Sequence, residues 1–187
     1  ESYASAATTA DAAAGYWRLG ESTGATTAVD SSGNSNPGTY TNTGSLVYEV
    51  GGVVIGDASS AVTFNGTLGH VLIGTVAALQ PTAAVSAEAW FKTSACASLC
   101  TIAGSGADGY VLFLESGLPK FAVKRGGTAA LAASDGAANT HAGHTVRGVR
   151  EGHGPRGGEV TGTWGWQGNH GGMEGGTYLE LGSFGGS

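Results

Sequence analysis

Short runs in which apolar and polar residues alternate recur along the chain, and Gly, Asn and Asp separate them. Alternation with a period of two places one set of side chains on one face of a β strand, whereas an amphipathic helix needs a period near 3.6. No convincing amphipathic helix is found in the sequence. The runs predict strands at residues 15–19, 61–64, 70–73, 85–92, 110–114, 120–124 and 178–181, with weaker strands at 128–133 and 145–150.

The spacing of these runs predicts how the strands are arranged. Strand runs separated by roughly ten residues, with turn residues between them, are typical of an antiparallel sandwich rather than of alternating strands and helices. We therefore expect an all-β fold of two sheets packed face to face. The period-two pattern predicts that a set of aromatic side chains fills the core, namely Trp17, Phe64, Trp90, Phe113 and Phe121.

Composition limits the number of domains and the class of partner. A chain of 187 residues suits one hydrophobic core. We expect residues 15–187 to form that domain and residues 1–14, which are rich in Ala, to be a connector or a short helical lead-in. Only 12% of the residues are charged and the net charge is -6, so a phosphate backbone is an unsuitable partner.

Several motifs have the pattern of a known family. The stretches YWRLGESTG at 16–24, AVDSSGN at 28–34 and GTY at 38–40 are followed by AVTFNG at 61–66 and VSAEAWFK at 85–92. In this order they resemble the laminin G-like domain, a concanavalin A-like jelly roll of bacterial secreted proteins and actinobacterial phage tail proteins. The resemblance implies a jelly-roll sandwich acting as a structural or adhesive module of a larger extracellular or virion protein.

The match weakens after about residue 134. The segment 143–152 lacks the tryptophan that the family has at this point, and 153–160 has few apolar residues to pack. Similarity resumes at 176–186, and the chain then stops before the family's closing strand. We expect either an incomplete domain or a sheet that another segment or subunit completes.

Acidic residues show no catalytic arrangement. Glycoside hydrolases of this fold carry several acids on one strand, two residues apart, so that a nucleophile and an acid/base face one groove. Here Glu88 stands alone between alanines, and the other acids are scattered over separate loops and strand ends. We expect the domain not to be an enzyme, and no cofactor to be required.

The loop at residues 30–36 has two interpretations. Asp30, Asn34 and Asn36 offer carboxylate and amide oxygens of the kind that Ca²⁺ binds. Alternatively, Asp and Asn side chains bond to nearby backbone amides in such turns, and Gly33 supplies a positive φ.

The loop at residues 164–170 has two interpretations as well. Trp164 and Trp166 offer flat apolar faces that stack on sugar rings, and Gln167, Asn169 and His170 can bond to hydroxyl groups. The same tryptophans can instead cap the open end of the core. The histidines of this region, at 141, 144, 153 and 170, match no compact zinc motif.

Two cysteines lie four positions apart, Cys96 and Cys100. We expect a small disulfide between the strand that ends near Lys92 and the one that starts near Thr101, with two reduced thiols as the alternative. A disulfide fits an extracellular or virion-surface location. The sequence has neither an N-terminal signal-peptide pattern nor a run of about 20 apolar residues that would insert into a membrane.

Two functions from different classes follow. The first is a non-catalytic structural or adhesive module whose partners are other domains or subunits of the same assembly. The second is a carbohydrate-binding module, calcium-assisted in one version, that targets an enzyme or adhesin to a cell-surface polysaccharide. Because one fold hosts many functions, the resemblance does not choose between them.

Overall fold

The computed structural model describes most of the N-terminal two thirds of the chain and several strands beyond it. The described residues are 5, 8, 12–52, 58–80, 85–93, 99–105, 109–116, 118–125, 128–132, 144–150, 160–162 and 178–184. In these ranges no helix is long and apolar enough to cross a bilayer. From residue 12 onward the described helical elements are two short 3-10 turns, η2 (Thr43–Ser45) and η3 (Ala77–Leu79).

Strands make up the rest of the regular structure, as the period-two pattern predicts. Their bounds are β1 (Gly15–Trp17), β2 (Thr27–Ala28), β3 (Gly38–Thr41), β4 (Leu46–Gly51), β5 (Ser60–Phe64), β6 (His70–Leu72), β7 (Val85–Lys92), β8 (Leu99–Gly104), β9 (Tyr110–Glu115), β10 (Leu118–Arg125), β11 (Thr128–Ala132), β12 (His144–Arg150), β13 (Val160–Gly162) and β14 (Tyr178–Phe184). Each run that the sequence predicts as a strand lies on one of these, and β2, β3, β4 and β13 were not predicted.

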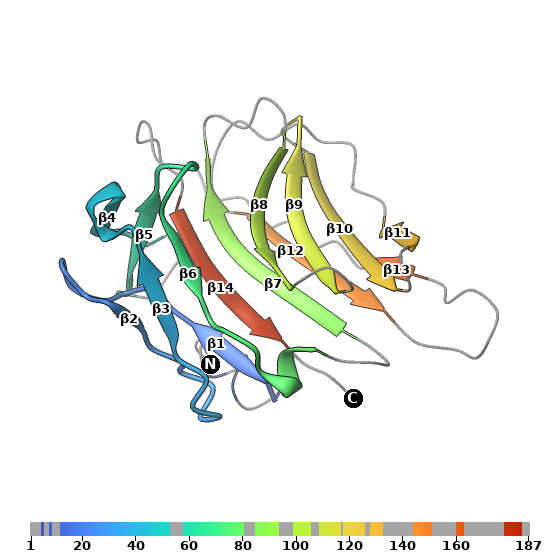
Figure 1. Cartoon of the computed structure of the whole chain (residues 1–187), viewed down its shortest axis with the longest axis horizontal. Coiled ribbons are helices and arrows are strands. Elements are labelled where there is room, and N and C mark those ends of the chain that lie inside the picture. Colours follow the sequence, from blue (N-terminus) through green and yellow to red (C-terminus); the bar gives the residue numbers. More distant parts are fainter. Residues whose placement is uncertain are drawn as a thin grey trace.

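The strands form three antiparallel sheets (Figure 1). The large sheet has the order β13-β12-β7-β14-β5-β4, and β1 also pairs with β14. A four-stranded sheet has the order β11-β10-β9-β8, and a three-stranded sheet has the order β2-β3-β6. The sequence-distant strands β7 and β14 are central neighbours in the large sheet, with Leu179 opposite Phe91. The prediction of an all-β, antiparallel fold is confirmed.

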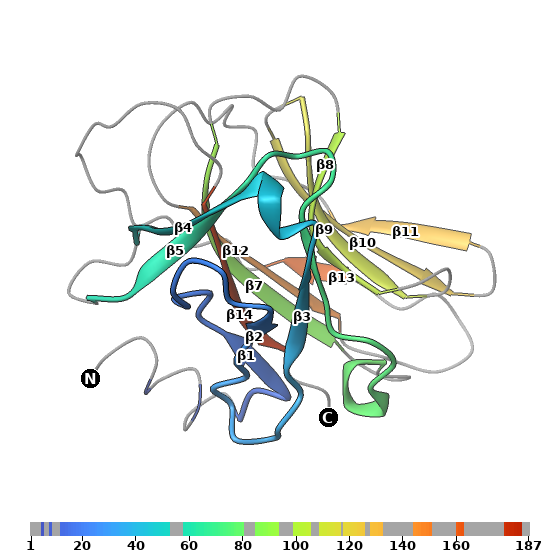
Figure 2. The ribbon, with the colours of Figure 1, turned by 60° about the vertical axis from the view of Figure 1, so that its left-hand side comes forward.

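One core joins the three sheets into a sandwich-like arrangement (Figure 2). Trp17 and Phe91 come from the large sheet, Phe121 from the four-stranded sheet and Tyr40 from the three-stranded sheet, and all four belong to the same buried cluster. Burying one such large side chain stabilises the fold by about 1.5–3 kcal/mol. The core therefore holds the two smaller sheets against the large one.

A pair of tyrosines connects the large and the three-stranded sheets directly. The rings of Tyr40 on β3 and Tyr48 on β4 meet edge to face, with centroids 5.2 Å apart. Both hydroxyls donate hydrogen bonds at the rim of the core, Tyr40 to Glu21 Oε2 at 2.6 Å and Tyr48 to the carbonyl oxygen of Ala25 at 2.9 Å. Burial, and then the Glu21 carboxylate, raise the pKa of Tyr40, so this ring stays neutral.

The predicted core is right for three aromatic residues and wrong for two. Trp17, Phe113 and Phe121 are buried, whereas Phe64 and Trp90 are partly exposed. On β7 the buried side chains are Ala87, Ala89 and Phe91, so strand alternation turns Trp90 to the opposite face of the large sheet. Phe64 ends β5, where it packs against the edge of the core and lines a cleft.

Gly15 provides a test of the packing around Trp17. A Cβ at residue 15 would overlap the Trp17 indole, which is fully buried and has no room to move. We expect Gly15→Ala to lower the free energy of unfolding by about 1–3 kcal/mol, as overpacking does elsewhere. Chemical denaturation measures this change in the free energy of unfolding. The control is Gly44→Ala, where a Cβ meets nothing within 4 Å, and equal stability losses in both variants would contradict this account.

Candidate functional site: a cleft between two strands

The loop predicted to bind calcium is a hydrogen-bonded turn that fastens β1. Asp30 Oδ1 accepts hydrogen bonds from the backbone amides of Tyr16 and Ser32, each at 2.9 Å, and Asp30 Oδ2 accepts one from the amide of Asn36 at 2.9 Å. Partial burial raises the pKa of Asp30, but these hydrogen bonds outweigh it, and the net result is a lowered pKa. The carboxylate is therefore stabilised in its charged form by the turn itself.

Both asparagines of this loop bind the chain that precedes β1. Asn34 Nδ2 donates to the carbonyl oxygen of Ala13 at 2.8 Å, and Asn36 Nδ2 donates to that of Ala14 at 2.9 Å. The indole nitrogen of Trp17 donates to the backbone oxygen of Asn36 at 2.9 Å. Gly33 has a φ of 89°, as the turn interpretation predicts. The three residues do come together, in the geometry of that interpretation, and calcium binding stays a prediction.

The other predicted site residues give less to build on. Trp164, Trp166, Gln167, Asn169 and His170 lie outside the described residues. Cys100 is disulfide-bonded, and the described chain contains no free cysteine. The only other cysteine of the sequence, Cys96, also lies outside the described residues, so the pairing of the two stays a prediction.

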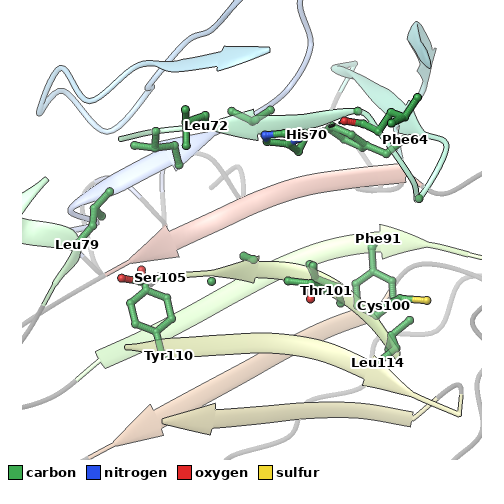
Figure 3. A pocket seen from close by; sticks show the side chains of 18 of the residues that line it. Phe64, His70, Leu72, Leu79, Phe91, Cys100, Thr101, Ser105, Tyr110 and Leu114 are labelled. Carbon is green, nitrogen blue, oxygen red and sulfur yellow. Dashed lines mark hydrogen bonds between the residues drawn. The ribbon is translucent and has the colours of Figure 1, made fainter. Parts of the chain in front are cut away.

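A cleft that the sequence did not predict opens between β6 and β8 (Figure 3). Its volume is about 960 Å³. One wall is formed by residues 64–76 around β6, and the other by residues 99–105 around β8. Phe91 of β7 and Leu114 of β9 line it from the core side, and Leu79 of η3 closes one end (Figure 3). The cleft is the seam between the two smaller sheets.

Among the described residues that line the cleft there is no Asp, Glu, Lys or Arg. The titratable groups of this described lining are His70 and Tyr110, and its cysteine, Cys100, is disulfide-bonded. Burial raises the pKa of Tyr110 to about 12, so its hydroxyl is neutral at physiological pH. Leu68, Leu72 and Leu99 are more than half exposed on the lining. A cleft of this composition suits an uncharged ligand with apolar groups.

Local hydrogen bonds fix the turn at the β5 end of the cleft. Asn65 Oδ1 accepts backbone hydrogen bonds from Thr67 at 3.0 Å and from Leu68 at 3.1 Å. Asn42 Nδ2 donates to the carbonyl oxygen of Leu68 at 2.8 Å, which ties this turn to the end of β3. The exposed Leu68 is thus held by its backbone rather than by burial. The wall of the cleft is ordered before any ligand binds.

The opposite wall belongs to a hairpin. β8 and β9 pair antiparallel in it, with a shift of register between Thr101 and Ala103. The amide of Ser105 donates to the carbonyl oxygen of Tyr110 at 2.9 Å and closes the hairpin. The sequence also holds a signal for the cleft, since residues 71–73 are consecutive apolar residues in a half-exposed strand. A continuous run of this kind indicates a strand with two apolar faces.

Fold and cleft together define an all-β protein with a sandwich-like core and an uncharged cleft in one layer. Comparison of the chain with protein-family models, with curated proteins and with solved structures finds no match. In the described residues no group of three or more His, Cys, Asp or Glu side chains is placed to hold a metal ion.

Asp30→Asn tests whether the carboxylate fastens the turn. The amide retains one acceptor oxygen but turns an NH₂ group toward the amide of Asn36, where the native Oδ2 accepts. We expect a loss in unfolding free energy on the order of 1 kcal/mol near neutral pH, because water screens this partly exposed group.

The pH dependence of that loss follows from the lowered pKa of Asp30. A lowered pKa stabilises the fold above the ordinary value of 3.8, and the contribution disappears as the pH falls through the folded-state pKa. The stability difference between the native protein and Asp30→Asn should then shrink in acid, as urea denaturation across that range measures. Glu49→Gln, which alters an exposed acceptor for Thr23, is the control. A difference that stays constant with pH would contradict the charged-turn account.

Proposed function

We propose that the chain is a non-catalytic binding module, with a laminin G-like jelly-roll architecture, that serves as a structural or adhesive part of a larger extracellular or virion protein. The observation that carries the proposal is the uncharged cleft of about 960 Å³ between β6 and β8, set in a core that all three sheets share. Recognition sites collect on such openings because the packed scaffold holds their walls in place.

The chemistry of the cleft supports binding rather than turnover. General acid–base catalysis needs a carboxylate, imidazole or similar group poised at a reacting atom. His70 is the imidazole of the lining, and its Nδ1 is 3.2 Å from the backbone oxygen of Leu68 on its own turn. The remaining polar side chains of the lining are hydroxyls and amides such as Asn65, Gln80 and Thr101, which bind ligands through neutral hydrogen bonds.

The state of Cys100 supports the proposed location. Disulfides persist in secreted proteins and on virion surfaces, and they are rare in the reducing cytosol. Cys100 is disulfide-bonded and lies on a wall of the cleft. The bond therefore favours an oxidising compartment and stiffens the strand that borders the candidate site.

A cleft-binding test uses two families of neutral probe. Peptides with alternating Val and Thr, and hexasaccharides of glucose with different linkages, are titrated into isotope-labelled protein while backbone amide shifts are recorded. We expect at least one family to shift amides of β6 and β8 saturably. Because the lining is uncharged, the dissociation constant should change less than about twofold between about 50 mM and about 500 mM NaCl. If neither family shifts these amides, the binding-module proposal is wrong.

Carbohydrate binding is the second candidate function, and the predicted tryptophan loop is its basis. We expect the double variant Trp164→Ala, Trp166→Ala to lose binding on a glycan array. Its thermal midpoint should stay nearly unchanged provided that the two indoles are exposed, because an exposed indole contributes little to the core. Running the array with and without a chelator tests the predicted calcium contribution of Asp30, Asn34 and Asn36. A variant that unfolds several degrees earlier, from a parent that binds no glycan, would instead identify the tryptophans as caps of the core.

A further inference from the structure

The two walls of the cleft are the last strands of their sheets. β6 pairs with β3 on one side, and β8 pairs with β9 on one side. Within the described residues no strand pairs with the other side of either. Backbone N–H and C=O groups alternate between the two sides of a strand, so each of these edges presents a row of donors and acceptors to the cleft.

The two edges run in the same direction. In Figure 3 the labelled residues advance together along the two walls, from His70 to Leu72 on β6 and from Thr101 to Ser105 at the end of β8. Figure 1 shows the same order, with β14 and β7 of the large sheet visible between β6 and β8. Neighbours in an antiparallel sheet run in opposite directions. Two facing edges that run the same way therefore have the geometry of the first and third strands of an antiparallel sheet, and no described strand lies between them.

We propose that the cleft accepts an extended segment of a partner polypeptide, which lies antiparallel to both β6 and β8 and joins the two smaller sheets into one. The inference rests on the proposed binding function and names its ligand class. Main-chain hydrogen bonds to both edges would supply affinity, and alternate side chains would supply specificity. The segment is uncharged, because the described part of the lining holds no acidic or basic side chain that would pair with a charge.

Side chains on the two faces of such a strand have different surroundings. One set points toward the core, where Phe91, Ile102 and Leu114 line the cleft. This set is apolar. The other set points outward beside Leu72 and Leu99, which are each 58% exposed. Because removing the exposed surface of these leucines from water is favourable, moderately apolar residues also fit on the outward face of the bound segment.

A polypeptide fits these walls better than a saccharide does. Sugar rings stack on exposed aromatic faces. At the cleft Phe91 and Tyr110 are almost fully buried, at 2% and 6% exposure, and Phe64 at the end of β5 is the partly exposed phenyl ring of the described lining. Saccharides also lack the regular row of amide donors and carbonyl acceptors that matches a strand edge. The peptide is therefore the ligand class that the described lining favours.

The test uses the uncharged peptide TVTITVT, with acetylated and amidated ends, and two backbone-methylated versions of it. One version is N-methylated at the odd residues and the other at the even residues, which removes the donors on one edge or on the other while all side chains are kept. Titration calorimetry measures binding. We expect each methylation to weaken binding by about tenfold or more, because each removes the pairing to one wall.

Four results, from this calorimetry and from the amide-shift titration described above, would overturn the proposal. Equal binding of all three peptides would show that no strand pairing takes place, and weakening by only one methylation pattern would show addition to a single edge. If a glucose hexasaccharide binds more tightly than the peptide and shifts the same amides, the ligand is a saccharide rather than a peptide strand, and the binding function still stands. Failure of every probe to shift these amides would remove the binding function as well.

Substitutions on the cleft wall have a closely matched control. Leu72→Glu and Leu99→Glu place a charge in the cleft at residues that are 58% exposed, and Val47→Glu places one at an equally exposed residue of β4. We expect the first two substitutions to weaken peptide binding by about tenfold and the third to leave the binding affinity unchanged. All three variants should remain folded. Equal effects of the three variants would contradict binding in the cleft.

Hydrogen exchange gives a readout that is independent of side chains. Bound peptide should slow exchange of backbone amides on both β6 and β8, since strand pairing occupies donors on each. Protection confined to residues away from these strands would overturn the proposal. Sedimentation of the protein alone tests whether a second copy of the chain occupies the cleft. If the protein forms a dimer and the peptide dissociates it, the cleft binds a second copy, and the assignment to a different partner is wrong.

Discussion

The arrangement of the molecule depends on one requirement, that the large sheet must bury the apolar side chains of its inner face. Trp17, Val62 and Phe91 project from that face into a single core, and no one small sheet supplies all of the covering residues. Tyr40 comes from the three-stranded sheet, and Leu112 and Phe121 come from the four-stranded sheet. Apolar burial is non-directional, so it holds both covering sheets in place without requiring that they pair with each other. The seam between the two coverings is the cleft.

Directional interactions then fix the parts that burial leaves free. The Asp30 turn, through three backbone hydrogen bonds and the two asparagine side chains, ties β1 and the residues before it to the edge of the core. Asn65 does the same for the turn between β5 and β6, which forms one end of the cleft. Asp30 and Asn65 have short polar side chains, and their oxygens accept the hydrogen bonds of backbone amides that have no backbone acceptor in a turn. These turns position the walls, and the walls position the site.

Much of the strand pattern could be predicted, and its errors have physical causes. β7 was predicted with its correct bounds because apolar and polar residues alternate from Val85 to Ala89 and two aromatic residues follow. The wrong assignment of Trp90 to the core is an error of phase: large aromatic residues suggest burial, yet Ala87, Ala89 and Phe91 are the residues that face inward. The small strands β2 and β3 escaped prediction because two to four residues are too few to give a readable period.

The sequence by itself determined that the chain is built from antiparallel strands, that Asp30 lies in a loop of oxygen-rich and turn-forming residues, and that few charges are available for recognition. Local propensity and composition are enough for these features, because each depends on residues close together in the chain. Only the tertiary structure decided that β6 and β8 face each other as two strand edges running the same way. Their residues lie about thirty positions apart, and the gap between them is set by how two sheets pack on a third, which no local pattern encodes.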